Sequence, residues 1–340
     1  MENGNIKVWL PTVRAGTGTD VFTTRLAEAL EQKGIATKIS WFPLRYEMAP
    51  FLLRRATAPS GTNIIFTNSW NGFAFKRQSI PLVVTSHHPD YIATGSQLNL
   101  AQYLYHRVLI RQYEHASFGA ADALTADSAF TGDSLKGTRW ADKLEVIHLW
   151  TDVQKYHPPA QCHTAAGRPF RLLFVGNQSY RKGADLLPRI MRELGSDFRL
   201  DIVGRIGKEQ DSTFPENMSA LGWLSEDELI RAYQECDALL FPSRWEGFGY
   251  CVLEAMACGK PVVTSNAAAL PEVVSNGTTG ILCKTGSVES YVAACRRLAA
   301  NPGQAISMGK AGRQRAVENF SEDKLVARYV DLIKRLVRPT

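Results

Sequence analysis

The feature that most constrains the fold is a series of short apolar segments that alternate with helix-like stretches. Eleven segments have this character: Ile6–Pro11, Thr37–Phe42, Asn63–Asn68, Leu82–His87, Ala123–Asp127, Leu144–Trp150, Arg171–Gly176, Leu200–Gly204, Ala238–Pro242, Pro261–Ser265 and Ile281–Lys284. Their Val, Ile, Leu and Phe residues are clustered rather than alternating with polar ones, which is typical of strands buried on both faces. Helix-like stretches lie between them: Val21–Lys33, Leu98–His115, Ser225–Glu235 and Ser287–Ala300 among others. The pattern predicts an α/β fold with two doubly wound parallel sheets.

The two halves of this pattern indicate two domains. A chain of 340 residues exceeds what one hydrophobic core usually supports. The polar stretch 157–169 contains several Pro and Gly residues and marks the expected boundary. We expect one domain over residues 1–160 and a second over 168–320. Residues 321–337 carry apolar side chains at helical spacing and predict a C-terminal amphipathic helix.

Composition and charge exclude several classes of protein. No segment approaches the ~20 consecutive apolar residues of a membrane-spanning helix, and the N-terminus lacks a signal-peptide pattern. The protein is therefore expected in the cytoplasm. The net charge of +6 is spread over both halves, which argues against nucleic-acid binding, because that usually needs a concentrated basic patch. A mild positive excess suits anionic small ligands or an anionic membrane surface.

The six cysteines predict neither a disulfide framework nor a metal centre. They lie at positions 162, 236, 251, 258, 283 and 295, with no C-x-x-C pair. Reduced, mostly buried thiols are the expected state. No spacing of His, Asp and Glu residues resembles a metal site either.

The strongest chemical signal lies in residues 243–264. Glu246 and Glu254 bracket a glycine-containing turn that joins an apolar strand to a helix. This arrangement offers free backbone N–H groups to a phosphate. The expected donors are the amides of Phe248, Gly249 and Tyr250, while glycines 247 and 249 permit close approach of a ligand.

The two carboxylates suit a nucleotide sugar. A carboxylate near a helix start can accept hydrogen bonds from both ribose hydroxyls, as we expect for Glu254. One just before the turn can bind a sugar hydroxyl, as we expect for Glu246. Either glutamate alone is more often a capping or solvated residue, but the complete segment favours a functional site.

This segment resembles the Glu-x7-Glu signature of the retaining glycosyltransferases of family 4. Four further stretches are similar to that family: Arg171–Gly183, Leu200–Gly204, Leu221–Ser225 and Pro271–Gly280. The resemblance covers nearly the whole chain. It implies the GT-B fold, in which two Rossmann-like domains face a cleft. It also implies a nucleotide-sugar donor, no bound metal and no further cofactor.

The resemblance assigns a phosphate-binding role to the loop after Gly176. Arg181 and Lys182 are expected to bind the diphosphate and to stabilise the charge that develops as it leaves. The family often has Arg directly after the strand glycine, where this chain has Asn177. Either Arg181 or Arg205 is expected to supply the missing charge.

Two sites in the first domain are expected to complete the active site. Gly16 and Gly18 precede a predicted helix, in a geometry that suits phosphate or sugar contact at the helix N-terminus. His87 ends an apolar strand and matches a histidine of the family, so it is expected to donate a hydrogen bond to a sugar hydroxyl. A plain turn and a structural histidine are the alternatives, and for the adjacent His88 the structural role is favoured.

Two stretches combine basic residues with apolar or aromatic ones, Phe51–Arg55 and Leu98–Glu114. In the second, apolar residues including Val108 and Leu109 recur at helical spacing. The favoured interpretation is a core-facing helix with a solvated basic side. The alternative is a peripheral membrane contact on the cytoplasmic face that brings the protein to a lipid-linked acceptor.

The expected function is transfer of a sugar from a nucleotide sugar to a hydroxyl of a saccharide or lipid-linked acceptor, with retention at the anomeric carbon. Synthesis of cell-surface polysaccharide or lipopolysaccharide is the expected setting by analogy. The C-terminal domain would bind the nucleotide and the N-terminal domain most of the acceptor, with the C-terminal helix returning to the latter. A GT-B sugar-nucleotide epimerase and a non-catalytic nucleotide-sugar-binding subunit remain alternatives.

Overall fold

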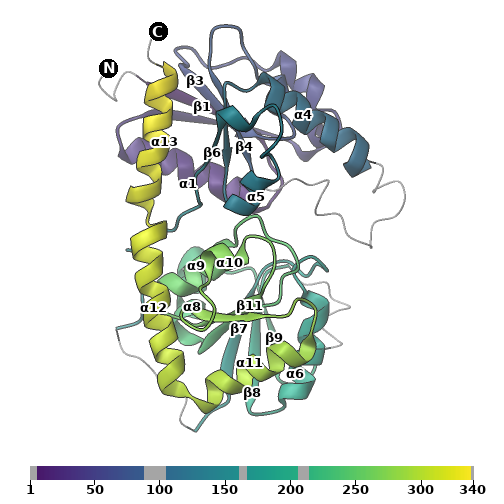
Figure 1. Cartoon of the computed structure of the whole chain (residues 1–340), viewed down its shortest axis with the longest axis vertical. Coiled ribbons are helices and arrows are strands. Elements are labelled where there is room, and N and C mark those ends of the chain that lie inside the picture. Colours follow the sequence, from purple (N-terminus) through teal and green to yellow (C-terminus); the bar gives the residue numbers. More distant parts are fainter. Residues whose placement is uncertain (1–5, 88–104, 161–166, 206–213, 338–340) are drawn as a thin grey trace. The chain divides into compact units, whose positions relative to one another are not determined.

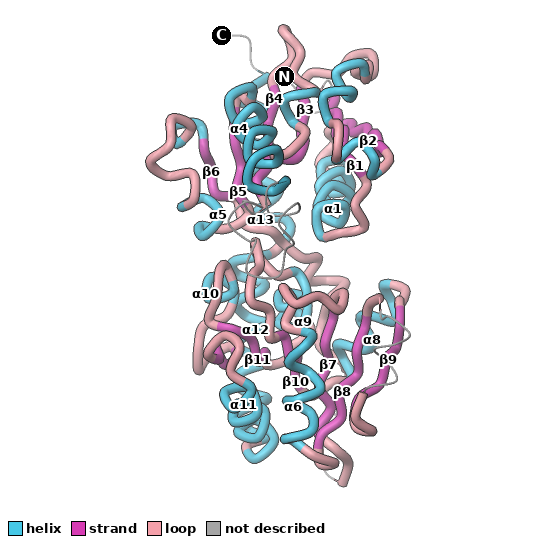
Figure 2. The backbone as a smooth tube through the Cα atoms, turned by 90° about the vertical axis from the view of Figure 1, so that its right-hand side faces the viewer, coloured by secondary structure: helices cyan, strands magenta, loops and turns pink. Residues whose placement is uncertain are grey.

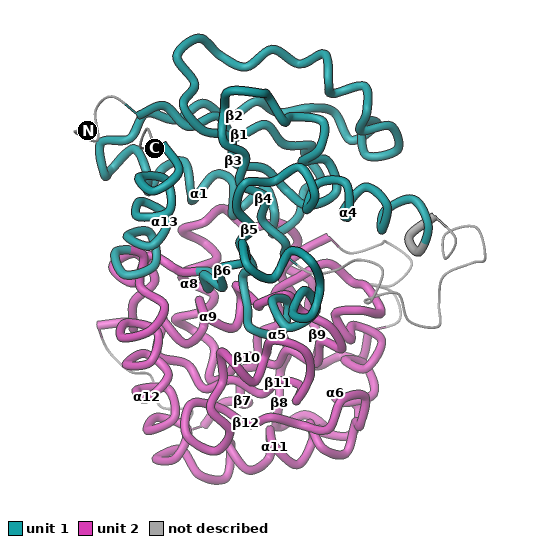
Figure 3. Tube along the Cα trace, turned by 45° about the horizontal axis from the view of Figure 1, so that its top comes forward, with its two compact units in different colours: residues 1–149, 323–340 teal, residues 150–322 magenta. Residues whose placement is uncertain are grey.

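The computed structural model describes residues 6–87, 105–160, 167–205 and 214–337. The chain divides into two compact units, shown in different colours in Figure 3. Unit 1 comprises residues 1–149 and 323–340, and unit 2 comprises residues 150–322. Each unit contains one six-stranded parallel sheet.

The sheet of unit 1 has the order β2-β1-β3-β4-β5-β6. Its strands are β1 (Lys7–Val13), β2 (Ala36–Phe42), β3 (Ile64–Asn68), β4 (Leu82–Ser86), β5 (Ala123–Ala126) and β6 (Leu144–Val146). Every residue of β3, β4 and β5 is buried, because helices and loops cover both faces of the sheet. The strand order reverses between β1 and β3, so the loops after these strands lie side by side.

Among the described residues of unit 1, the helices are α1 (Gly18–Gln32), α4 (Arg111–Ala120), α5 (Ala129–Asp133) and most of α13 (Glu322–Val337). Short turns of other helix types are η2 (Leu44–Glu47), η3 (Pro50–Arg55), η4 (Gly72–Ala74), η5 (Tyr105–Ile110) and η6 (Ala141–Lys143). In Figure 1 the yellow helix α13 lies beside α1. Tyr329 of α13 is buried and contacts the rings of Phe22 on α1 and Phe66 on β3. The C-terminal helix is therefore part of the core of unit 1.

The sheet of unit 2 has the order β12-β11-β10-β7-β8-β9. Its strands are β7 (Phe170–Val175), β8 (Phe198–Val203), β9 (Met218–Gly222), β10 (Ala238–Phe241), β11 (Val262–Ser265) and β12 (Gly280–Cys283). Its described helices are η7 (Ala184–Leu186), α6 (Leu187–Leu194), α8 (Glu226–Glu235), α9 (Tyr250–Ala257), α10 (Leu270–Val273), α11 (Val288–Ala300) and α12 (Pro302–Phe320). Figure 2 shows these helices (cyan) packed around the strands (magenta). The order reverses between β7 and β10, as in the doubly wound dinucleotide-binding fold.

The predicted fold class is confirmed, and each predicted strand matches an observed one to within a few residues. The prediction omitted β9, an edge strand that is only partly buried. The predicted helix 98–115 is described only from residue 105 onward. From residue 105 the chain forms the π-helical turn η5 and continues as α4.

Candidate functional site

The loops after β7 and β10 meet where the strand order of unit 2 reverses. These two strands pair in parallel, so their carboxyl ends share one edge of the sheet. Ligands of open α/β sheets bind at such a reversal. The loop after β7 carries Arg181 and Lys182, and the loop after β10 carries Glu246. The Arg244 amide donates a 2.8 Å hydrogen bond to the Arg181 carbonyl and ties the two loops together.

Glu246 is the centre of a compact charged cluster. Its side chain is only 8% exposed, and its Oε1 lies 2.7 Å from Lys182 Nζ and 3.5 Å from a guanidinium nitrogen of Arg181. Ser243 Oγ donates to the same oxygen at 2.8 Å. Burial alone would raise the pKa of Glu246, but the two cations and the hydrogen bonds from Lys182 and Ser243 outweigh it and lower that pKa. The cluster thus holds two cations against one ionised carboxylate, which suits a further anion.

Gly183 allows the cation-bearing loop to approach β10. Its φ is +70°, a left-handed conformation that glycine adopts without strain. A Cβ at this position would lie 2.1 Å from the carbonyl oxygen of Pro242. The Lys182 ammonium lies 4.9 Å from the centre of the Phe241 ring at the end of β10. Only a glycine at 183 lets the two loops pack this closely.

Arg244 and Asp185 support this loop, and sequence reasoning missed both. The Arg244 guanidinium forms two hydrogen bonds with the Asp185 carboxylate, at 2.7 and 2.9 Å. It also lies 3.8 Å above the ring of Tyr180. These residues are far apart in the sequence, and only the pairing of β7 with β10 brings them together.

The helix α9 begins at Tyr250, after the glycine-containing turn that follows Glu246. Gly249 is its N-cap, with a φ of +104°. The Phe248 side chain is buried and packs against Phe320. Backbone amides in the first turn of a helix have no partner within that helix. This turn can therefore offer an anion the main-chain N–H groups around Gly247, Gly249 and Tyr250.

Glu254 lies in the second turn of α9, near the helix start as predicted. It is buried, and its Oε2 accepts a 3.0 Å hydrogen bond from the hydroxyl of Tyr233 on α8. Burial first, and then the nearby Glu254 charge, raise the pKa of Tyr233 well above its usual value. The phenol therefore stays a hydrogen-bond donor. Tyr233 fixes the orientation of the carboxylate, a role that the sequence alone did not indicate.

Asn177 and Arg205 follow the neighbouring strands β7 and β8, and both are exposed. The preceding glycines pack tightly, since a Cβ on Gly204 would lie 2.3 Å from the Gly176 carbonyl oxygen. Arg205 lines a hollow of about 640 Å³ together with Trp223, whose side chain is 76% exposed. Arg181, by contrast, contacts Glu246.

In unit 1, Gly16 and Gly18 follow β1, the strand at which the order of that sheet reverses. Gly18 is the first residue of α1. The Gly16 amide donates a 2.7 Å hydrogen bond to the Asp20 carboxylate, and the Ala15 amide donates to the same group. Asp20 thereby occupies the Gly16 amide, one of the backbone donors of the turn that is predicted to contact phosphate or sugar.

His87 follows β4 and pairs with Asp127, which follows the neighbouring strand β5. His87 Nδ1 lies 3.4 Å from an Asp127 carboxylate oxygen, and the imidazole packs edge-on against Phe22 at 4.9 Å. Asp127 thus restrains the imidazole. Sequence reasoning missed Asp127, although its place after a buried strand next to β4 is a usable signal. His88 lies outside the described residues.

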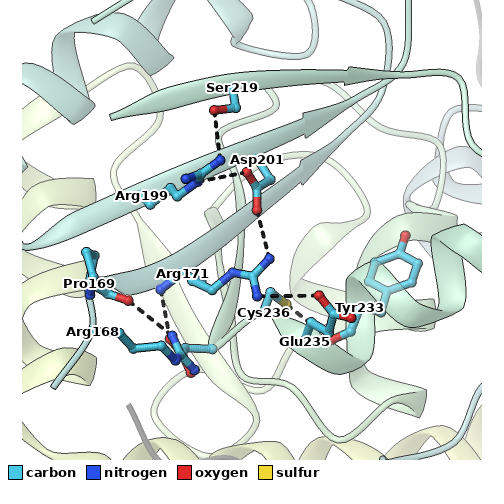
Figure 4. A network of polar contacts seen from close by, with 10 residues as sticks. Arg168, Pro169, Arg171, Arg199, Asp201, Ser219, Tyr233, Glu235 and Cys236 are labelled. Atoms are coloured by element: carbon cyan, nitrogen blue, oxygen red, sulfur yellow. Dashed lines mark hydrogen bonds and ion pairs between the residues drawn. The ribbon is translucent and has the colours of Figure 1, made fainter. Parts of the chain in front are cut away.

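A second charged network lies around the start of β7 (Figure 4). Arg168 forms two hydrogen bonds with Asp237, at 2.7 and 2.9 Å. Arg171 contacts Asp201 at 3.2 Å and Glu235 at 3.4 Å, beside a cavity of about 200 Å³. The network joins the end of α8 to β7 and β8. Figure 4 also shows Tyr233 on α8. Its hydroxyl donates the hydrogen bond to Glu254 described above.

Among the described residues, no cluster of three His, Cys, Asp or Glu side chains has a geometry that could hold a metal ion. None of their helices has the length and apolar character needed to cross a bilayer.

Each unit of the chain matches a known protein family. Residues 13–155 match the family Glycosyltransferase Family 4, and residues 161–315 match Glycosyl transferases group 1. The chain belongs to glycosyltransferase family 4. All the proposed site residues of unit 2 fall within the second match.

Curated relatives and solved structures resemble this chain as well. A glycogen synthase of Mycobacterium tuberculosis is 31% identical over 212 residues, which are 59% of this chain and 51% of that protein. The chain thus spans about half the length of this relative. A sucrose-phosphate synthase from Thermosynechococcus elongatus superposes with a TM-score of 0.84 at 20% identity, covering 97% of this chain and 99% of the other. Anabaena HepE in complex with UDP and glucose gives 0.77 at 17% identity, covering 97% and 100%. These structures share the GT-B fold predicted from the sequence.

Proposed function

We propose that this family 4 protein is a retaining glycosyltransferase that uses a nucleotide-sugar donor. The acceptor is a hydroxyl of a saccharide or of a lipid-linked saccharide. The observation that carries the proposal is the buried Glu246, held by Lys182 and Arg181 beside the N-terminus of α9. The HepE structure contains UDP and glucose and supports a nucleotide-sugar ligand.

The charges of the cluster explain how a diphosphate would bind. Without ligand, Glu246 serves as counter-ion to Lys182 and Arg181. A diphosphate brings more negative charge than one carboxylate can, so we propose that it takes over both cations. The first-turn amides of α9 add further donors. Glu246 then accepts a hydrogen bond from a hydroxyl of the donor sugar.

Glu254 is the proposed ribose ligand. Its Oε2 accepts a hydrogen bond from the Tyr233 hydroxyl, which orients the carboxylate. A carboxylate can accept hydrogen bonds from both hydroxyls of a ribose. A pre-oriented carboxylate loses little conformational entropy on binding. Asn177 and Arg205 line the approach after β7 and β8 as further proposed ligand contacts.

The reaction breaks the bond between the anomeric carbon and the diphosphate oxygen. The acceptor oxygen bonds to the same face of that carbon, and its proton passes to the departing phosphate. Lys182 and Arg181 stabilise the charge on the leaving group. His87, restrained by Asp127, donates a hydrogen bond to a sugar hydroxyl, and the Gly18 turn provides backbone contacts. We propose that the reaction occurs in the cytoplasm and contributes to cell-surface polysaccharide or lipopolysaccharide.

Ligand-induced shifts in the thermal unfolding midpoint test donor binding. UDP, GDP, ADP and dTDP are compared with their sugar conjugates. The matching nucleotide at ~100 times its dissociation constant should stabilise the protein by about 2.7 kcal/mol. The Lys182→Met variant should show a much smaller stabilisation. Equal stabilisation of this variant would contradict the proposed site.

Proton NMR of the product tests the stereochemistry. The selected donor is incubated with and without a panel of saccharide acceptors, and the coupling of the anomeric proton is measured. The proposal predicts a product with the anomeric configuration of the donor, formed only when acceptor is present. Conversion of the donor to an epimer without acceptor would instead identify an epimerase.

A further inference from the structure

Unit 1 exposes a group of large apolar side chains within one short segment, Leu44–Arg55. Four of them are 46–64% exposed: Leu44, Met48, Phe51 and Leu52. The arginines of the segment are exposed as well: Arg45, Arg54 and Arg55. Glu47 is its only acidic residue. We refer to these four apolar residues and three arginines as the η2–η3 surface.

The geometry of η3 explains why Phe51 and Leu52 are exposed. A 3₁₀ helix has three residues per turn, so residues three apart share a face. Pro50 and Leu53 are buried, and Leu53 packs in the core with Trp9 and Phe75. With that face turned inward, Phe51 and Leu52 occupy the other two faces. The sequence-based expectation of a core-facing stretch is therefore wrong for Phe51 and Leu52.

Polar and aromatic contacts hold this segment to the body of unit 1. The guanidinium of Arg77 donates to the carbonyls of Ala74 and Lys76 and, at 3.4 Å, to that of Arg54. Arg54 lies 5.5 Å above the ring of Phe73. Phe73 in turn stacks on Tyr113 of α4 at 5.7 Å. These contacts fix the position of the segment that carries the exposed apolar side chains.

We propose that the η2–η3 surface docks unit 1 onto an anionic membrane surface. Lipid is the occupant that its chemistry favours, since three arginines against one glutamate complement anionic headgroups. The apolar side chains between them can enter the acyl boundary, while the long arginine stems keep their charged ends among the headgroups. The inference concerns unit 1 and does not depend on the proposed reaction.

Co-sedimentation with lipid vesicles tests this proposal on the full chain. Vesicles of phosphatidylcholine alone are compared with vesicles containing about one-third phosphatidylglycerol. Only the anionic vesicles should bind the protein, and added salt should weaken binding. The Arg54→Gln/Arg55→Gln variant should bind about 30-fold more weakly, which corresponds to about 1 kcal/mol per arginine. The Phe51→Ser/Leu52→Ser variant should lose at least about 10-fold.

A matched control replaces two apolar residues of similar exposure on α12 of unit 2. Ile306 and Val317 are 43% and 40% exposed, and the Ile306→Ser/Val317→Ser variant should bind vesicles like the parent. Thermal unfolding of each variant shows whether weaker vesicle binding results from lost folding. Nucleotide binding of each variant shows whether the proposed donor site is intact. Equal binding to neutral and anionic vesicles would overturn the proposal. So would a concentration-dependent dimer that the Phe51→Ser/Leu52→Ser change abolishes, because the surface would then be a self-interface.

Discussion

Glu246 makes the sharpest residue-scale prediction. Replacing it with Gln keeps the shape but removes the charge opposite Lys182 and Arg181. We expect transfer to fall by at least about 100-fold, because the proposed sugar contact and the balance of charge are both lost. The variant should keep the parent's circular dichroism spectrum. Near-parent activity in the transfer assay would remove Glu246 from the mechanism.

The pKa of Glu246 also predicts how stability depends on pH. The pKa is lowered in the folded state from an ordinary value of 4.5. A lowered carboxyl pKa contributes stability that is complete above the unfolded-state value and is lost as pH falls through the folded-state value. The difference in unfolding midpoint between the parent and Glu246→Gln should therefore be largest near neutral pH and shrink below about 4.5. A difference that grows on acidification would contradict the cluster.

Tyr233 is expected to act through Glu254. Tyr233→Phe removes one buried hydrogen bond, which costs about 1–3 kcal/mol of stability. Because the Glu254 carboxylate loses the hydrogen bond that orients it, nucleotide affinity should also fall about 5- to 10-fold. Tyr291→Phe is the matched control, since the buried Tyr291 hydroxyl bonds to Ser265 at 2.7 Å instead. If calorimetric titration gives both variants the same nucleotide affinity, Tyr233 has only a structural role.

At the scale of elements, the approach of the loop after β7 to β10 depends on Gly183. Gly183→Ala should lose about 1–2 kcal/mol from its left-handed backbone and at least about 1–3 kcal/mol more from contact with Pro242. Nucleotide binding should fall as Lys182 moves. Gly195→Ala is the control, because Gly195 also has a positive φ but open space around its Cβ position. Denaturant unfolding that ranks the two variants equally would contradict the tight packing.

The strands could be predicted because each buried run is apolar by itself. The edge strand β9 lacked that signal, since Ser219 and Ala220 carry little apolar surface. The sequence predicted Glu246, Lys182 and Arg181 as separate site residues but did not predict that they contact one another. The pairing of Glu246 with Lys182 spans 64 residues and depends on the place of β10 beside β7. The same holds for Tyr233 and Glu254, which come from two helices with no local signature of contact.

At the scale of the whole molecule, the C-terminal helix returns to unit 1. Six side chains of α13 are buried: Leu325, Val326, Tyr329, Val330, Leu332 and Ile333. Deleting residues 323–340 should unfold unit 1, because each lost side chain contributes about 1.5–3 kcal/mol and a domain is stable by only about 5–15 kcal/mol. Limited proteolysis should then degrade unit 1, while unit 2 keeps its affinity for nucleotide.

The surface ion pairs of α13 provide the control for this deletion. Arg328 and Arg335 both contact Glu145, at 2.9 and 2.6 Å. Replacing both arginines with Ala should cost only about 1 kcal/mol per pair or less. A deletion mutant that resists proteolysis as well as this double variant would show that α13 is dispensable for unit 1.

Binding of a nucleoside diphosphate at the strand reversal of unit 2 is tested most directly by a crystal structure with the nucleotide selected in the unfolding panel. The account predicts phosphate oxygens within hydrogen-bonding distance of Lys182 Nζ and of the first-turn amides of α9, with Glu246 released from Lys182 and Glu254 on the ribose. Density for the phosphates away from the β7 and β10 loops, with the Lys182–Glu246 pair intact, would contradict it.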